Sequence, residues 1–536
     1  ASGASLSLYC QGLNQSSHGT HNNAGIIHLH LATGQIGKPG AGPFSLTGQP
    51  NAMGGREVGG LSNLMSAHRD MANPVHRAEM ARFWGVPFVP ATPGKAAVEL
   101  FKSLKSGSVK AVWIACTNPA QSLPNQAAVR EALQAAEYVV LQEAYANTDT
   151  AEYADLLLPA SGWGEKHGTV TNSERCISRV LPAVPPPGEA RHDWQIVVDF
   201  ARLLGKKLDQ AGVERLFPYA DAEAIFNEHR ESTRGRDLDI TGLSYELLES
   251  AGPQQWPYPE GATAGKIRLY EDGIFPTADG KARFVAIEHL PTADILNSET
   301  PISLLSGRMR DHWHGMSRTG TVPRLFNLED EPLLAMHPCD MRHRSLDTGD
   351  LVKVSNGRGE LTVRVAEQAG LQRGRAWMPM HWGNQFMNSP GANAVVSDAV
   401  DPFSKQPELK HAAVQIAKLD LPYPLAIIRR CPDQESALEL MQRARAALPR
   451  FAYATLNLYG RGSPLVVFRA ALAEAISTEL LAEMDILFGL DGEEGAIVFA
   501  DASRRIAKKA ISIDGRLQGI RLAGETLAQT WLKKAM

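Results

Sequence analysis

Glycine and polar side chains are concentrated together in one loop-forming stretch, residues 34–60 (GQIGKPGAGPFSLTGQPNAMGGREVGG). Nine of its 27 residues are glycine and three are proline, and it also contains Gln49, Asn51, Arg56 and Glu57. Glycine lets a backbone adopt positive φ and approach a ligand closely, so this mixture is typical of backbone wrapped against a large polar molecule. The same composition also fits an ordinary flexible loop, and other parts of the chain must decide between the two.

Four further polar segments interrupt the apolar runs of the chain. Neutral amides and hydroxyls gathered in loops suit a ligand with ring nitrogens, carbonyls and phosphates, and arginine can bind a phosphate through two hydrogen bonds. Taken singly, each segment could be a solvated surface loop. The segments are GLNQSSHG (Gly12–Gly19), CTNPAQSLPN (Cys116–Asn125), WGEKHGTVTNSER (Trp163–Arg175) and SGRMRDHWHGMSRTG (Ser306–Gly320).

The apolar runs predict the elements that position these segments. Residues 1–205 alternate strand and helix: a strand over 108–115, a helix over 125–136, a strand over 138–141 and, after a further turn and helix, a strand over 155–159. This rhythm predicts an α/β fold with a parallel sheet and right-handed crossovers. Ligands of such sheets bind at the carboxyl ends of the strands, so the loops TNPAQS and QEAYAN are expected to face a ligand.

The rest of the chain divides into three regions. Residues 206–300 are less regular and contain the proline-rich patch GPQQWPYPEG, which is typical of a connector packed on other domains. Residues 301–419 hold short apolar runs between turn signals such as DTGD and NGRG, a pattern that predicts a compact β-barrel. Residues 420–536 return to mixed α and β, with a helix expected over 434–447 and a strand-turn-strand over 510–522.

Composition excludes several classes of partner. The chain has 536 residues with 44% hydrophobic composition, typical of a soluble globular protein. Its 54 basic and 58 acidic residues give a net charge of −4, so no basic field indicates a nucleic-acid partner. No apolar stretch approaches the roughly 20 residues that span a bilayer, so no membrane partner is expected.

The cysteines are dispersed, without CxxC spacing. This pattern favours the reduced thiols of a cytosolic protein over a disulfide framework. It also argues against an iron–sulfur cluster within these residues, because clusters need closely spaced thiolates. The five cysteines are Cys10, Cys116, Cys176, Cys339 and Cys431.

Taken together, the motifs resemble the molybdopterin oxidoreductases (the DMSO reductase superfamily), which hold molybdenum between two pterin guanine dinucleotides. Within that superfamily the chain is most similar to the assimilatory nitrate reductases. The resemblance runs from about Ser5 to Ile416 and rests on LATGQIGKPGAGPFSLTGQPNAMGG, GTVTNSER, SGRMRDHWH and DPFSKQPELKH. It implies a doubly wound, mostly parallel α/β core, a double-psi β-barrel that closes over both pterins, and a small C-terminal α+β region.

The same resemblance implies the function. The expected cofactor is molybdenum bis(molybdopterin guanine dinucleotide), and the expected reaction is cytoplasmic reduction of nitrate to nitrite by oxygen-atom transfer. Gln49 and Arg56 lie where relatives line the pocket beside the metal. A guanidinium there could bind two oxygens of planar nitrate. The alternative for Arg56 is a salt bridge within the loop to Glu57.

The resemblance also implies the residues that contact the dinucleotides. For Asp193 a second, compatible role is that of an acidic residue at a helix N-terminus. For Lys410, as for Glu408 and Asp401, the alternative is a solvated charged face. No metal ligand is expected in this chain, and for His312 and His314 the resemblance favours cofactor contact or packing. The expected contact residues are Gln11, Gln15, Asn118, Gln142, Glu143, Lys166, Asp193, Ser306, Gly307, Arg308, Met309, Arg310, Asp311, His312, Trp313, His314, Gly315, Asn393 and Lys410.

Two features of the family are missing from the sequence. The N-terminal cysteine set for a [4Fe–4S] cluster is absent, and so is the cysteine that ligates molybdenum, because Cys10 precedes a later motif. The chain is therefore expected to be the C-terminal portion of a longer subunit whose N-terminal part carries the cluster. Residues 420–536 resemble an extra region found in some assimilatory enzymes, and could equally dock an electron-donor protein or reductase subunit.

Three other functions are compatible with parts of the sequence. One is another molybdopterin oxidoreductase, such as a formate dehydrogenase, since the deciding metal ligand is not in the sequence. A second is a non-catalytic cofactor-binding fragment. The third, an ordinary nucleotide-binding α/β protein, is disfavoured because no GxGxxG follows a strand as that fold requires.

The missing thiolate gives a first prediction. Expressed alone, the chain is expected to reduce no nitrate with reduced viologen dye, because the metal would lack its protein ligand and its route of electron entry. Clear turnover of nitrate by the 536-residue chain would contradict this expectation.

Overall fold

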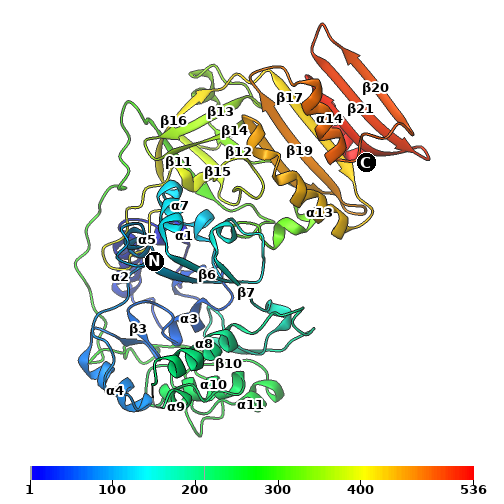
Figure 1. Ribbon diagram of the computed structural model, residues 1–536. Helices are drawn as coiled ribbons and strands as arrows, with labels where there is room; N and C mark the ends of the chain where they lie inside the picture. The colour runs from blue at the N-terminus through cyan, green and yellow to red at the C-terminus, as the bar shows by residue number, and fades with distance from the viewer. Residues whose placement is uncertain (1–2, 211) are drawn as a thin grey trace.

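The computed structural model describes residues 3–210 and 212–536. Figure 1 shows an α/β body that contains the N-terminus, a β-barrel beside it, and a second sheet beyond the barrel that contains the C-terminus. None of the described helices is long and apolar enough to cross a membrane.

A three-stranded parallel sheet forms the centre of the N-terminal body, in the order β5-β6-β7. Helix α7 connects the first two strands, as expected, but a 3-10 helix, η1, replaces the predicted helix before β7. The central elements are β5 (Ala111–Ala115), α7 (Gln126–Ala135), β6 (Tyr138–Glu143), η1 (Asp149–Tyr153) and β7 (Leu156–Pro159).

Helices cover both faces of this sheet. On one face α5 (Ala97–Lys105) packs against α7, where Leu104 and Leu133 are buried. On the other face the Trp113 ring of β5 meets Phe200 of α8 (Asp193–Lys207), with ring centroids 4.9 Å apart. The predicted doubly wound α/β core is confirmed.

Further short elements complete the N-terminal body. Residues at both ends of helix α4 fix its length. The Asn73 side chain caps its start by accepting a hydrogen bond from Val75 N, and Gly85, with φ of +65°, ends it. The elements are β1 (Leu6–Tyr9), α1 (Gln11–Asn14), α2 (Gly19–Ala32), β2 (Gly42–Ser45), α3 (Ala52–Glu57), β3 (Leu64–Met65), β4 (Arg69–Asp70), α4 (Pro74–Trp84), α6 (Pro119–Ser122), η2 (Trp163–Glu165), β8 (Gly168–Thr171) and β9 (Cys176–Val180).

The region 206–300 is helical at first and then extended. Its buried side chains Leu238, Leu243 and Trp256 pack with Ile177 of β9. Residues 256–301 contain no helix or strand and run along one side of the molecule to the barrel (Figure 1). The elements are α9 (Val213–Leu216), α10 (Ala222–Ser232), α11 (Tyr245–Ser250) and β10 (Gln254–Gln255).

The predicted barrel is confirmed as a closed six-stranded barrel in the order β11-β15-β12-β14-β13-β16. Alternate residues of its strands fill the interior, and Val352, Val363 and Met378 are fully buried. The elements are β11 (Ile302–Gly307), η3 (Thr319–Thr321), η4 (Pro323–Phe326), β12 (Leu333–Met336), α12 (Pro338–Arg342), β13 (Leu351–Asn356), β14 (Gly359–Glu367), β15 (Arg375–Pro379), η5 (Ala392–Ala394) and β16 (Ala412–Lys418).

The C-terminal region forms an antiparallel six-stranded sheet in the order β18-β19-β17-β22-β21-β20. The predicted strand-turn-strand is present: Asp514 and Gly515, both with positive φ, form its two-residue turn. The elements are β17 (Tyr423–Arg430), α13 (Gln434–Arg445), η6 (Leu448–Arg450), β18 (Tyr453–Tyr459), β19 (Leu465–Leu472), α14 (Thr478–Leu487), β20 (Ala496–Asp501), β21 (Ile506–Ile513), β22 (Arg516–Ala523) and α15 (Gln529–Ala535).

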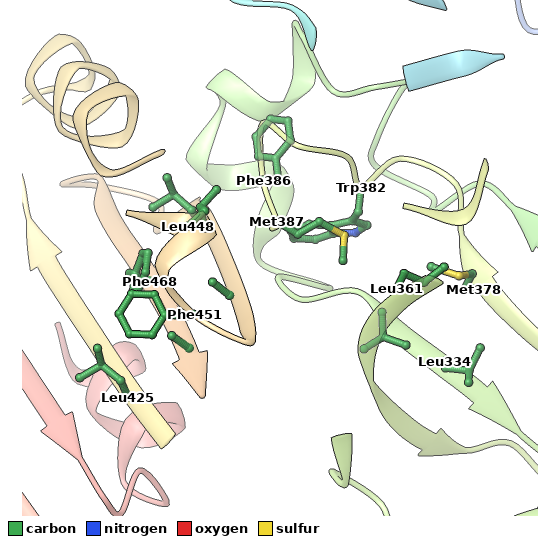
Figure 2. Packing of buried hydrophobic residues seen from close by; sticks show 14 of the residues in the cluster. Leu334, Leu361, Met378, Trp382, Phe386, Met387, Leu425, Leu448, Phe451 and Phe468 are labelled. Atoms are coloured by element: carbon green, nitrogen blue, oxygen red, sulfur yellow. The ribbon is translucent and has the colours of Figure 1, made fainter. Parts of the chain in front are cut away.

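One hydrophobic core continues from the barrel into this second sheet. Figure 2 shows Trp382, Phe386 and Met387 between the barrel side chains and those of the C-terminal sheet, such as Phe451 and Phe468. Because the two domains share a core, the C-terminal sheet is a fixed extension of the barrel.

A buried network of charges reinforces the same junction. Arg469 of β19 and Lys533 of α15 both pair with Asp330, and Arg469 also donates to the Asp330 carbonyl at 3.1 Å. Burial raises the pKa of Asp330, but Arg469 and Lys533 outweigh it and hold that pKa below its ordinary value. The carboxylate is therefore charged and paired at neutral pH.

This network gives a stability prediction. Arg469→Gln leaves Asp330 and the neighbouring Glu331 short of a buried partner, so the free energy of unfolding should fall by about 3 kcal/mol. Urea denaturation monitored by tryptophan fluorescence measures the change. Arg461→Gln, at an exposed turn, is the matched control and should change stability by less than about 0.5 kcal/mol. Equal effects of the two variants would contradict the structural role of Arg469.

Candidate functional site

The glycine-rich stretch lies against the loop that follows the first barrel strand. A Cβ atom on Gly48 would lie 2.4 Å from an Arg308 guanidinium nitrogen and 2.7 Å from the Trp313 ring. The next residue, Gln49, places Nε2 3.4 Å from Nε2 of His314. A side chain at position 48 would therefore displace the Arg308 side chain and the Trp313 ring, so glycine allows the stretch to lie close to the barrel loop.

Positive charge gathers at this junction without carboxylate partners. The Arg308 guanidinium stacks over Trp313, 4.3 Å from the ring centroid, and Lys410 Nζ lies 3.2 Å from Met380 Sδ. Within the described part of the chain neither cation forms an ion pair. Burial, with Arg308 nearby, lowers the pKa of Lys410 to about 8. Such a cluster is suited to an anionic ligand.

Burial and these two cations also lower the pKa of His314. A cavity of about 510 Å³ opens beside Lys410, between the barrel and the first segment of the chain. Gln15, Arg373 and Arg375 line it as well, so its barrel wall is also basic. The cavity is large enough to hold part of an extended polar ligand.

Two strand ends of the parallel sheet carry amides with one unpaired atom each. Asn118, after β5, accepts hydrogen bonds from Thr150 N and Oγ1 at 3.0 and 2.7 Å. Gln142, in β6, donates to Asp193 Oδ1 at 2.8 Å. Asn118 Nδ2 and Gln142 Oε1, like Gln15 Oε1, are buried and find no hydrogen-bond partner among the residues the structure describes. Buried polar atoms are normally satisfied, and a bound ligand or a water molecule can supply the partner that these three lack.

Asp193 links several of the predicted residues. It is the first residue of α8, as its helix N-terminal role requires, and it pairs with Lys166. Although burial raises the pKa of Asp193, hydrogen bonds from Lys166 and Gln142 hold it below its ordinary value. Burial and the same carboxylate raise the pKa of Cys116 to about 12, so that thiol remains protonated at neutral pH.

His381, which sequence reasoning missed, holds the barrel loop in shape. The ring is fully buried, with Nδ1 2.7 Å from the His314 carbonyl and Nε2 accepting from Met309 N at 2.9 Å. The only sequence signal was its place in MHWGNQ, a polar segment directly after the barrel strand AWMPM.

Gln121 and Asn393 join this loop region to the core. A Cβ on Gly315 would lie 2.9 Å from Gln121 Oε1, so the barrel loop packs closely on the core loop. Asn393 Nδ2 donates to the carbonyls of Gln121 and Ser122 at 3.3 and 2.9 Å. The predicted Asn393 therefore bridges the two domains, whereas Gln121 carried no signal of its own.

Some predicted residues pack within the protein or at its surface and do not line the cavity beside Lys410. Arg310 and Asp311 pair with each other at 3.0 Å at the surface, and the Arg310 side chain is 73% exposed. Met309 is buried in the core. Ser306 Oγ donates to the Leu409 carbonyl at 3.0 Å, and Gly307 abuts the Trp377 ring.

The His312 ring packs against an aromatic side chain. Its ring centroid is 4.4 Å from that of Phe326, and burial lowers its pKa to about 4. Its Nδ1 lies 3.2 Å from Thr319 Oγ1. Across the described residues no three histidine, cysteine or acidic side chains are grouped to hold a metal ion.

The salt bridge considered between Arg56 and Glu57 is not formed. Glu57 is buried and accepts instead from Trp256 Nε1 at 2.5 Å and Thr171 Oγ1 at 2.7 Å. Arg56 is exposed, and its Nη2 lies 2.8 Å from Met53 Sδ. Its guanidinium is thus free of carboxylates in the described structure.

The solvated charged face considered for Glu408 and Asp401 is wrong. Both are buried: Glu408 accepts from Ser17 N at 3.0 Å, and Asp401 accepts from Thr20 N at 3.0 Å. They satisfy backbone donors at the start of α2, where a helix N-terminus favours negative charge. Lys410 is partly buried as well.

The remaining predicted residues lie at the edges of the same region. Glu143 accepts from Ala144 N at 2.7 Å, and burial raises its pKa. Gln11 opens helix α1, and Gln49 is exposed. The structure thus brings Gly48 and Gln49 of the glycine stretch against the barrel loop, with Lys410 near Arg308 and His314 of that loop. We call this junction, together with the cavity that Gln15 and Lys410 line, the cleft.

Two family models match the chain. The molybdopterin oxidoreductase model covers residues 2–203, and the molydopterin dinucleotide binding domain model covers residues 302–413. Both matched ranges contribute residues to the cleft.

Relatives with known names support the same grouping. A nitrate reductase of Klebsiella oxytoca is 42% identical over 77% of this chain and 47% of its own length. A nitrate reductase of Synechocystis is 41% identical over 77% of this chain and 57% of its own length. The assimilatory nitrate reductase catalytic subunit of Bacillus subtilis is 34% identical over 76% of this chain and 56% of its own length. The chain spans about half the length of these curated relatives.

The lowered pKa of Lys410 gives a prediction about anion binding. Because Lys410 loses its charge as pH rises through about 8, binding of sulfate, whose own charge is constant, should weaken several-fold between about pH 7 and 9. Isothermal titration calorimetry at fixed ionic strength measures this.

In Lys410→Arg the guanidinium stays charged, so the loss of affinity should be clearly smaller. Lys405→Arg, at an exposed position, is the control and should behave as the unmodified chain does. The same pH dependence in all three proteins would contradict a role for Lys410.

Proposed function

The chain belongs to the molybdopterin oxidoreductase family, and from that premise we propose that it forms the dinucleotide-holding part of a nitrate reductase. The observation that carries the proposal is the pair of cations, Arg308 and Lys410, that have no carboxylate partner among the described residues where the glycine stretch meets the barrel. The dinucleotides and nitrate are both anionic, so both gain from positive charge that the protein leaves unpaired.

The residues present fit the cofactor. Pterin and guanine rings carry donors and acceptors along their edges, and Asn118 Nδ2, Gln142 Oε1 and Gln15 Oε1 are buried atoms that lack such partners within the described chain. Arg308 and Lys410 are placed to hold phosphates. When bound, the molybdenum centre supplies the two electrons and accepts the oxygen atom that nitrate loses on becoming nitrite.

Gln49 and Arg56 would bind and orient nitrate. The Arg56 guanidinium has no carboxylate partner in the described structure, so its planar donors can meet two oxygens of the planar anion. Gln49 contributes an amide that already reaches the barrel loop at His314. Together they would hold the anion in one orientation, and this positioning would be the contribution of these side chains to catalysis.

We further propose an iron–sulfur cluster, an electron-donor protein and a cytoplasmic location for the enzyme. An iron–sulfur cluster would need ligands from outside these 536 residues, because the five cysteines are free and ungrouped. An electron-donor protein or reductase subunit would deliver the electrons. Nitrate assimilation would place the enzyme in the cytoplasm.

The test uses the enzyme as purified from its host at its natural length. Nitrate-dependent oxidation of reduced viologen is expected, and Arg56→Lys should lower kcat/KM for nitrate by about tenfold or more, because lysine cannot bind two oxygens in plane. Molybdenum and pterin contents should stay unchanged. Arg82→Lys, on an exposed face of α4, is the control.

Two outcomes would contradict the proposal. Formate-driven reduction of the dye without nitrate activity would favour a formate dehydrogenase. Bound pterin dinucleotide without molybdenum, and without turnover, would indicate a non-catalytic cofactor-binding chain.

A further inference from the structure

Strand β20 leaves one edge of the C-terminal sheet open. Within the described residues it pairs with β21 alone. The opposite edge strand, β18, is covered by the barrel: Leu456 N donates to the Phe386 carbonyl at 2.8 Å, and Asn388 N donates to the Ala454 carbonyl at 3.1 Å. In Figure 1 the β20–β21 hairpin projects away from the rest of the molecule. Its backbone donors and acceptors are thus accessible to another strand.

The open strand is apolar as well as exposed. Ile497, Val498 and Phe499 are 64%, 66% and 55% exposed. Native edge strands are usually protected by lysine, proline or a bulge, because an unprotected edge pairs with other chains. The stretch from Ala496 to Ala500 (AIVFA) has neither lysine nor proline. A partner is therefore expected to cover it.

Charges flank this strand with opposite signs. Glu493 and Glu494 precede it, Arg504 and Arg505 follow it, and all four are exposed. Among the described residues none of the four belongs to an ion pair. In an antiparallel pair the start of one strand lies beside the end of the other, so the acidic end of one copy would meet the basic end of a second copy.

We propose that β20 is the dimerisation strand of this chain, pairing antiparallel with β20 of a second copy about a two-fold axis at Val498. In that register Val498 faces its own copy and Ile497 faces Phe499 of the second copy. A two-fold interface uses one surface twice and so requires self-complementarity. The apolar centre and oppositely charged ends of β20 meet that requirement. The proposal is independent of the reaction that the enzyme catalyses.

The first test is the molar mass of the full chain by light scattering and sedimentation equilibrium. The unmodified chain should form a dimer, and Val498→Glu should raise its dissociation constant at least about tenfold, because two carboxylates then face each other. Within one chain Val498 lies opposite Lys509, so the new glutamate gains a cross-strand partner and the hairpin should stay folded. Ile486→Glu, at a residue of α14 with 65% exposure, is the matched control and should leave the dimer intact.

Charge reversal tests whether the partner is a second copy. A variant with Arg504→Glu and Arg505→Glu, and another with Glu493→Arg and Glu494→Arg, should each be monomeric alone, because like charges would meet at both ends. Mixed one to one, they should form a heterodimer with both ends complementary again. Three results would each overturn the proposal: a monomeric unmodified chain, a dimer that survives Val498→Glu, or a mixture that stays monomeric. The unmodified chain would be monomeric if a different protein covers β20.

Discussion

The cleft depends on one buried imidazole. Burial lowers the pKa of His381 to about 4, so the ring is neutral at pH 7. One of its nitrogens can then donate a hydrogen bond while the other accepts one. The partners assign Nδ1 as the donor to the His314 carbonyl and Nε2 as the acceptor from Met309 N. A charged ring could not accept from Met309. The neutral ring thus fixes both ends of the loop that carries Trp313 and presents Gly315 to the core.

Charge is handled differently at two places in the molecule. At the junction of barrel and C-terminal sheet, Asp330 is buried with Arg469 and Lys533, and opposite charges are closely paired. In the cleft, Arg308 and Lys410 have no such partner within the described residues, and burial, with Arg308 nearby, lowers the pKa of Lys410. Pairing is expected where charges only join domains, and unpaired cations are expected where an anion binds. This contrast favours a ligand-binding role for the cleft.

Sequence reasoning located the elements well, because each is encoded by local pattern. The run AWMPM became β15, and the Asp514–Gly515 turn fell between two strands, as apolar runs and turn residues dictate. It failed before β7, where the few residues available form a 3-10 helix. It left a solvated face open as an alternative for Glu408, because the sequence does not distinguish a carboxylate that accepts from N–H groups near a helix start from one that faces water. His381 was missed because its partners are backbone atoms far away along the chain, set by topology rather than by pattern.

The most direct measurement is a density map of the protein with its cofactor bound. A pterin guanine dinucleotide in the cleft should place polar ring edges within hydrogen-bond distance of Asn118 Nδ2 and Gln142 Oε1, and a phosphate beside Arg308 or Lys410. A dinucleotide bound elsewhere, with those two amide atoms still unpaired, would contradict the assignment of the cleft.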